Sequence, residues 1–325
     1  MGSRGAPTGE SELSLEDPWL RRFKAWADER FPLAQGVLIS LLYLLALLYG
    51  RALESPGAVR LAAGDVPGLL AFTAFFLMLR ILDEHKDYEV DLRNYPHRIL
   101  QSGLITLGQL KVLCAGLVLL QLGVSLWLEG GLGPVVYLWL AVMLWTGLMT
   151  AEFFVGAWLK QRLVLYAVCH MLVMPLAIGW IVAMASPGDP PPLGAGLAAA
   201  LGFSFGSVFE IARKTRAPAD ERTGVDTYSK VLGPGGAAWA LAAMLAATTV
   251  LVWGLLRQIQ AGGAIAWTAA LAALFLAGGL PSVSFARLPT PERARLMQGA
   301  AFGAPLGQLV VFNLALIAER GLLWG

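Results

Sequence analysis

The residues best suited to chemistry lie in a charged segment between two apolar stretches. Asp83, Asp87 and Asp91 recur there every four residues, and Glu84 follows the first. A helix turns by about 100° per residue, so four-residue steps place these carboxylates on broadly one face. Such carboxylates repel one another unless a cation lies between them, and oxygen ligands suit Mg²⁺. The segment therefore predicts a Mg²⁺ site formed by Asp83, Glu84, Asp87 and Asp91.

A proline and an arginine complete this segment. Pro96 ends any helix, and Arg98 follows with a guanidinium whose shape matches phosphate oxygens. A metal and an arginine beside a membrane suggest chemistry on a phosphorylated lipid. A solvated loop between two membrane helices is the plainer alternative. The regular spacing, the arginine and a second polar segment favour the site.

The second polar segment begins at Glu210 and mixes both charges. Its carboxylates, which include Asp220, would hold a metal, while its cations, which include Arg213, Lys214 and Arg216, would clamp a diphosphate directly. A solvated surface of salt bridges is the plainer alternative. Glu210 would orient a nucleophile, although a salt bridge to Lys214 one turn later explains it equally well. A short turn between the two segments adds Lys160 and Arg162, which would bind phosphate or only flank a membrane helix.

The composition indicates an integral membrane protein. The 325 residues are 57% hydrophobic and only 14% charged, whereas an ordinary soluble domain carries about 25% charged residues. Spanning helices need roughly 17–25 mostly apolar residues. Nine segments qualify, and the polar segments are expected in the loops after the second and sixth: 33–50, 66–82, 108–128, 134–152, 163–185, 193–211, 235–256, 264–281 and 299–318.

The distribution of positive charge supports this division. Nine spans place 20 of the 24 lysines and arginines on the side that holds the N-terminus and both polar segments. Lysine and arginine concentrate on the cytoplasmic side of membrane proteins. The N-terminus and both polar segments are therefore predicted to be cytoplasmic, with the protein in the cell (inner) membrane.

The chain divides into a tail, 1–30, and a transmembrane domain, 31–325. In the tail, the segment from Trp19 to Arg30 would form an amphipathic helix on the membrane, with Trp19, Phe23 and Trp26 on one side. A short basic flank that only sets orientation is an equally good interpretation.

These residues resemble the UbiA superfamily of intramembrane prenyltransferases. That family's first motif is NDxxDxxxD, followed by Pro-x-Arg-Pro. Here the chain has Asp83-Glu84-x-x-Asp87-x-x-x-Asp91, then Pro96-His97-Arg98. The nine spans and the Lys-x-Arg at the start of the fifth also look like the family. The resemblance extends from about Arg30 to the C-terminus.

The second motif departs from the family pattern. That motif is usually rich in aspartate and ends in Asp-x-x-x-Gly. Counting back from Gly224, Asp220 matches its last aspartate, but Arg216 and Arg213 stand where carboxylates are usual. Three alternatives follow: the cations replace the charge of a second Mg²⁺, the substrate is altered, or the activity is lost.

The resemblance implies an all-α bundle of nine transmembrane helices around a central lipid-open cavity. It implies a Mg²⁺-dependent transfer of a prenyl group from a polyprenyl diphosphate to an unknown aromatic or other acceptor. The implied residues are catalytic Asp87, Asp91 and Glu210; diphosphate-binding Arg98, Lys160, Arg162, Arg213, Lys214 and Arg216; and metal-binding Asp83, Glu84, Asp87, Asp91 and Asp220.

Other reactions remain open at this point. A membrane terpene cyclase would capture the same allylic cation within its substrate. A phosphoribosyl-type transferase would act on a lipid phosphate, and a transporter or lipid-binding protein would use the scaffold without catalysis. The expected partners are small molecules and membrane lipid, with no nucleic acid.

Overall fold

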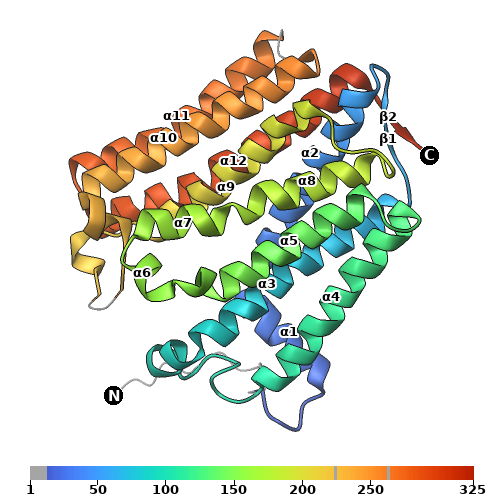
Figure 1. The fold of residues 1–325 in the computed structure, drawn as a ribbon. Helices are drawn as coiled ribbons and strands as arrows, with labels where there is room; N and C mark the ends of the chain where they lie inside the picture. Colours follow the sequence, from blue (N-terminus) through green and yellow to red (C-terminus); the bar gives the residue numbers. More distant parts are fainter. Residues whose placement is uncertain (1–12, 223–224, 262–263) are drawn as a thin grey trace, which may run out of the picture.

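The chain folds almost entirely into helices (Figure 1). A computed structural model describes residues 13–222, 225–261 and 264–325. The long helices are α2 (Leu33–Glu54), α3 (Asp65–Asn94), α4 (Leu107–Glu129), α5 (Pro134–Thr150), α8 (Val173–Ala185), α9 (Gly196–Arg213), α10 (Tyr228–Gln258), α11 (Ile265–Arg287) and α12 (Pro291–Arg320). The shorter elements are α1 (Trp19–Arg30), β1 (Val59–Leu61), η1 (Glu152–Phe154), α6 (Gly156–Lys160), α7 (Leu163–Met171), η2 (Leu193–Ala195), η3 (Pro218–Asp220) and β2 (Leu322–Trp324).

Eight helical segments within the described ranges are long and apolar enough to cross a membrane. Each coincides with one of the nine predicted spans. The remaining span corresponds to α5, which is apolar but has only 17 residues. At 1.5 Å per residue it is about 25 Å long, slightly less than the hydrocarbon core. The all-helical membrane fold is thus confirmed, while a count of nine crossings stays a prediction.

Successive helices pack side by side around a closed circuit. From α2 to α5 each helix contacts the next, α5 contacts α8, and from α8 to α12 each again contacts the next. The last helix, α12, packs back against α2. The fifth predicted span is divided at Leu172 into α7 and α8, which nevertheless continue in one direction (Figure 1).

The core of the bundle surrounds α8. Trp180 on this helix is fully buried, as are Tyr49 on α2 and Phe75 on α3. Small residues let neighbouring helices approach closely. A Cβ on Gly202 of α9 would lie 2.6 Å from the side chain of Ile178 on α8. The glycine therefore sets the distance between two central helices.

Charged residues gather at the two ends of the bundle. At one end, α1, the last turns of α3 and the segment after α9 lie together. At the other end, β1 pairs with β2 in parallel (Figure 1). Arg51 forms an ion pair with Asp65 there at 2.6 Å. This separation agrees with the charge pattern in the sequence. Which end faces the cytoplasm stays a prediction.

Two hollows lie beside α4, one near the start of α3 and the other near the start of α4. One, of about 370 Å³, is apolar and lies between α3 and α4 around Pro67, Val124 and Trp127. The other, of about 650 Å³, lies between Trp19 of α1 and the start of α4. Neither tests the predicted central lipid-open cavity, which stays a prediction.

Candidate active site

The acidic segment is helical. It was expected in a loop after a span ending at residue 82, but α3 continues without a break to Asn94. Apolar residues end at Leu82, yet the following residues keep helical backbone because Glu, Lys, Arg and Leu are good helix formers. The helix ends at Tyr95 because the residue before Pro96 is biased away from helical backbone. Asp83, Asp87 and Asp91 are thus held on a rigid element.

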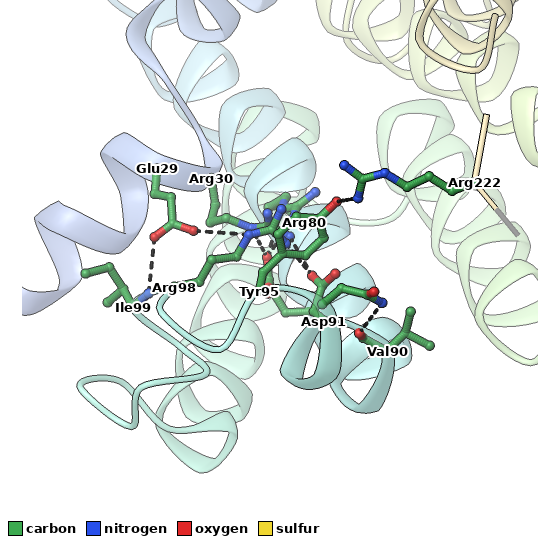
Figure 2. A network of polar contacts seen from close by, with 11 residues as sticks. Glu29, Arg30, Arg80, Val90, Asp91, Tyr95, Arg98, Ile99 and Arg222 are labelled. Carbon is green, nitrogen blue, oxygen red and sulfur yellow. Dashed lines mark hydrogen bonds and ion pairs between the residues drawn. The ribbon is translucent and has the colours of Figure 1, made fainter. Parts of the chain in front are cut away.

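Arginines bind two of the predicted carboxylates. Glu84 is only 1% exposed and accepts hydrogen bonds from Arg30 of α1 and from Arg80, the latter at 2.6 Å. Asp91 accepts from Arg98 at 2.7 Å and from Arg30 at 3.3 Å. Figure 2 shows this network where α1 meets the end of α3. These two carboxylates are neutralised by protein cations.

The predicted phosphate ligand Arg98 belongs to the same network. Beyond Asp91, its guanidinium lies 3.6 Å from the carboxylate of Glu29 and stacks over the ring of Tyr95, 3.8 Å from the centroid. Arg222, from the second polar segment, donates to the Tyr95 hydroxyl at 3.3 Å (Figure 2). Arg98 therefore joins α1, α3 and the second polar segment in this state, and its phosphate role stays a prediction.

Asp83 and Asp87 differ from their neighbours. Both side chains are exposed, and neither makes a hydrogen bond or ion pair with the described residues. They lie one turn apart on α3 and interact electrostatically with each other and with Arg213 across the site. Of the four metal ligands predicted in this segment, they are the two that remain available to an added cation.

No three His, Cys, Asp or Glu side chains within the described ranges are gathered as a preformed metal site. Mg²⁺ usually keeps several waters and takes only one or two carboxylates plus substrate phosphates. A pair of free aspartates fits that requirement better than a closed cage does. Asp83 and Asp87 are therefore the proposed Mg²⁺ ligands. Metal binding by Glu84, Asp91 and Asp220 stays a prediction.

The second polar segment is held by its own charges. Glu210 is 5% exposed at the end of α9, and it forms ion pairs with Lys214 at 2.7 Å and with Arg213. The salt bridge expected at the four-residue spacing is thus present. It leaves Glu210 engaged with two cations, and its predicted catalytic role is untested.

Downstream of Glu210 the chain is fixed by polar contacts to the start of α10. The backbone N–H of Arg216 donates to the hydroxyl of Ser229 at 2.8 Å, and that hydroxyl donates to Glu221 at 2.7 Å. Asp220 lies in η3 beside these contacts. The roles predicted for the side chains of Arg216 and Asp220 are not tested by these contacts.

Tyr166 lies between the two polar segments and was not singled out in the sequence. Lys86 of α3 donates to its hydroxyl at 2.6 Å, and Lys214 lies 5.8 Å from its ring centroid. His170 stacks on the same ring at 3.9 Å between centroids. The sequence contained one signal for this role. Tyr166 follows Arg162, a predicted phosphate ligand, by four residues, which is about one turn of the predicted fifth span.

Glu152 is a second functional candidate that the sequence did not reveal. Its carboxylate pairs with Lys86 at 2.7 Å and with Lys160 at 2.9 Å. Burial alone would raise the pKa of Glu152, but the two lysines lower it below its ordinary value. Arg162 is directed elsewhere, over the ring of Trp158 at 4.1 Å. Lys160 thus lies in the site, whereas Arg162 contacts an exposed tryptophan.

Comparison with known proteins decides the family. The model of the UbiA prenyltransferase family matches residues 36–302. The chain belongs to the UbiA prenyltransferase family. No curated protein sequence matches it.

Solved structures share the UbiA fold at low sequence identity. A UbiA homologue from Aeropyrum pernix K1 has a TM-score of 0.62 at 19% identity, over 86% of this chain and 98% of that one. A homologue from Archaeoglobus fulgidus bound to GPP and Mg²⁺ has a TM-score of 0.57 at 15% identity, over 90% and 99%. A structure of digeranylgeranylglyceryl phosphate synthase has a TM-score of 0.62 at 16% identity, over 92% and 99%.

Proposed function

We propose that this UbiA protein is a Mg²⁺-dependent prenyltransferase that moves a prenyl group from a polyprenyl diphosphate to an acceptor within the membrane. The observation that supports it is the pair of free carboxylates, Asp83 and Asp87, on a family fold and opposite a set of lysines and arginines. A UbiA homologue of the same fold was solved with GPP and Mg²⁺. The acceptor is an aromatic or other small molecule.

The proposed division of labour follows from the contacts. Asp83 and Asp87 would hold Mg²⁺ against the diphosphate, and the bound metal would neutralise negative charge as the allylic C–O bond breaks. Lys86, Lys160 and Lys214 would supply fixed positive charge to the leaving diphosphate. The prenyl chain would extend away from them, among the apolar helices.

The second polar segment supports a single metal site. Arg213 carries positive charge where the family resemblance expects a carboxylate, Lys214 follows it directly in the chain, and both are paired with Glu210. Cations near the diphosphate reduce the need for a second Mg²⁺. We therefore propose that this protein uses one Mg²⁺ together with these two side chains.

The same departure favours a second candidate, a UbiA-type terpene cyclase. Ionisation of the prenyl diphosphate would proceed as above, but the cation would be captured within the substrate. Such an enzyme needs no acceptor. The phosphoribosyl-type reaction lacks a comparable observation in its favour.

The test uses purified full-length protein in detergent with Mg²⁺ and geranyl, farnesyl or geranylgeranyl diphosphate. Diphosphate release and product masses are measured with and without aromatic acceptors. Release that depends on an acceptor, with a mass-shifted acceptor, supports the transferase. Acceptor-independent release with a cyclic product supports the cyclase. No release from any donor by folded protein contradicts both.

A further inference from the structure

Glu152, Phe153 and Phe154 form a left-handed turn. Their φ angles are 50°, 53° and 59°, a region that residues with a Cβ rarely adopt and almost never in succession. The ring of Phe153 packs edge-on against Trp145 and His170, at 5.4 and 6.0 Å between centroids. Tertiary packing therefore stabilises a left-handed backbone conformation that is unfavourable for these residues in isolation.

The turn places the carboxylate of Glu152 between two lysines. It inserts Glu152, 15% exposed, between Lys86 of α3 and Lys160 of α6, at 2.7 and 2.9 Å. Gly156 leaves the necessary space, because a Cβ there would lie 2.2 Å from the Glu152 carboxylate oxygen. The strained turn and the glycine together make room for this single anionic group.

The two lysines lie where a phosphate would need them. Lys86 is next to Asp87, one of the two free carboxylates, and its ammonium is also held by the Tyr166 hydroxyl at 2.6 Å. Lys160 approaches from a different element and is 58% exposed. Two ammonium groups from separate elements, converging on one carboxylate, can bind the oxygens of another anion in the same geometry.

We propose that Lys86 and Lys160 form a phosphate-binding site that Glu152 occupies in the unliganded protein. A phosphate group displaces the Glu152 carboxylate, and the left-handed turn relaxes as it leaves. Glu152 is thus an internal competitor of the ligand. This inference rests on the proposed function for its ligand, a diphosphate head group, but the same chemistry would accept a lipid phosphate.

The test measures binding of inorganic pyrophosphate with Mg²⁺, and separately of geranyl diphosphate, to full-length protein in phosphatidylcholine nanodiscs. Glu152→Gln keeps the side-chain shape and removes the competing charge, so both ligands are expected to bind severalfold more tightly. Gly156→Ala displaces the carboxylate without removing it and is expected to tighten binding as well. Lys86→Gln is expected to weaken both ligands.

Gly147→Ala serves as the matched control, since a Cβ there meets nothing within 4 Å. A merely structural role for Glu152 would lower affinity and thermal stability together, and would not tighten binding. Unchanged or weaker binding by folded Glu152→Gln protein overturns the inference. If neither wild type nor Glu152→Gln binds either ligand, the proposed function fails with it.

A second arm separates the two sources of phosphate. The titrations are repeated in nanodiscs that also contain phosphatidic acid. Competition with pyrophosphate that Lys86→Gln abolishes assigns the site to a lipid phosphate. Tighter binding of geranyl diphosphate by Glu152→Gln without such competition assigns it to the soluble head group.

Discussion

At the scale of single residues, neighbouring carboxylates of one acidic segment have different environments. Glu84 and Asp91 face α1 and are bound by arginines, whereas Asp83 and Asp87 face the second polar segment and have no ion pair among the described residues. The difference follows from the helix: successive residues point about 100° apart, so they meet different neighbours. The ability to bind a metal ion therefore differs from one carboxylate of the motif to the next.

Replacement of Asp87 tests this assignment. Asp87→Ala removes one of the two predicted metal ligands that no protein cation neutralises, and we expect kcat/KM with a prenyl diphosphate to fall about a hundredfold or more. Added Mg²⁺ should restore part of the loss if metal affinity is the cause. The control is Glu89→Gln, an exposed carboxylate on the same helix. Equal losses in both variants would contradict a specific role for Asp87.

Acid should weaken the ion pairs of Glu152. The pKa of this carboxyl is lower in the folded protein than its ordinary value of 4.5, because of Lys86 and Lys160. Its stabilising contribution is therefore complete above about pH 4.5 and is lost as pH falls through the lower folded pKa. Melting temperature measured from pH 7 to pH 3 should fall more steeply for wild type than for Glu152→Gln. Parallel curves would contradict this account.

At the scale of elements, α1 is a packed part of the site. Trp26 is fully buried, and Trp19 and Phe23 lie on the same side, with rings stacked at 5.0 Å. Arg22 donates to the carbonyl of Leu104 at 2.9 Å. The predicted amphipathic helix exists with the predicted bounds, and its apolar side also contacts protein. Whether it also contacts the membrane stays a prediction.

Removal of Arg30 tests the attachment of α1. Arg30→Ala leaves the buried Glu84 with Arg80 as its remaining partner, and we expect a loss of about 1–3 kcal/mol of stability. Thermal unfolding in detergent measures it. Lys24→Ala is the matched control, because its ion pair with Asp28 is largely exposed and surface pairs are worth little. A comparable loss in the control would show that the buried ion pair of Arg30 with Glu84 contributes no more than an exposed one.

The packing of α9 against α8 makes a second prediction at this scale. Gly202→Val places a branched side chain where a Cβ already lies within 2.6 Å of Ile178, so overpacking of about 1–3 kcal/mol is expected. The measurement is again thermal unfolding. Gly147→Val on α5 enters open space and should change stability little. A tolerated Gly202→Val would mean that α8 and α9 can move apart.

At the scale of the whole molecule, the circuit of helices brings distant segments to one end. Tyr95 contacts Arg222, and Lys86 and Lys214 approach Tyr166, although these residues are widely separated in the chain. Because α3 and α9 both end at this face, their polar extensions meet there. The site therefore forms because the order of the helices in the bundle brings these segments together.

Orientation is predicted for the molecule as a whole. The excess of lysine and arginine at the site end predicts that this end is cytoplasmic. Single cysteines are placed at Glu16 and at Gly325, with Cys114 and Cys169 changed to alanine. A membrane-impermeant thiol reagent applied to intact cells should label Gly325→Cys and leave Glu16→Cys unlabelled. The reverse pattern would invert the proposed topology.

The membrane class, the family resemblance and the positions of the long helices could all be predicted from the order of the residues. Apolar runs of sufficient length must be helical in a membrane, since backbone polar groups have no water there, so a linear pattern suffices. The salt bridge of Glu210 with Lys214 was also accessible, because four residues make about one turn of helix.

Which predicted carboxylates lack an ion pair, and which cations lie opposite them, depends on how the helices pack together. Arg30 reaches Glu84 across 54 residues of sequence, and Lys86 reaches Tyr166 across 80. The left-handed turn at Glu152 had no sequence signal, because non-glycine residues enter that region only when surrounding packing holds them there. Local rules fixed each helix, whereas the partners of each charge depended on how the bundle closed.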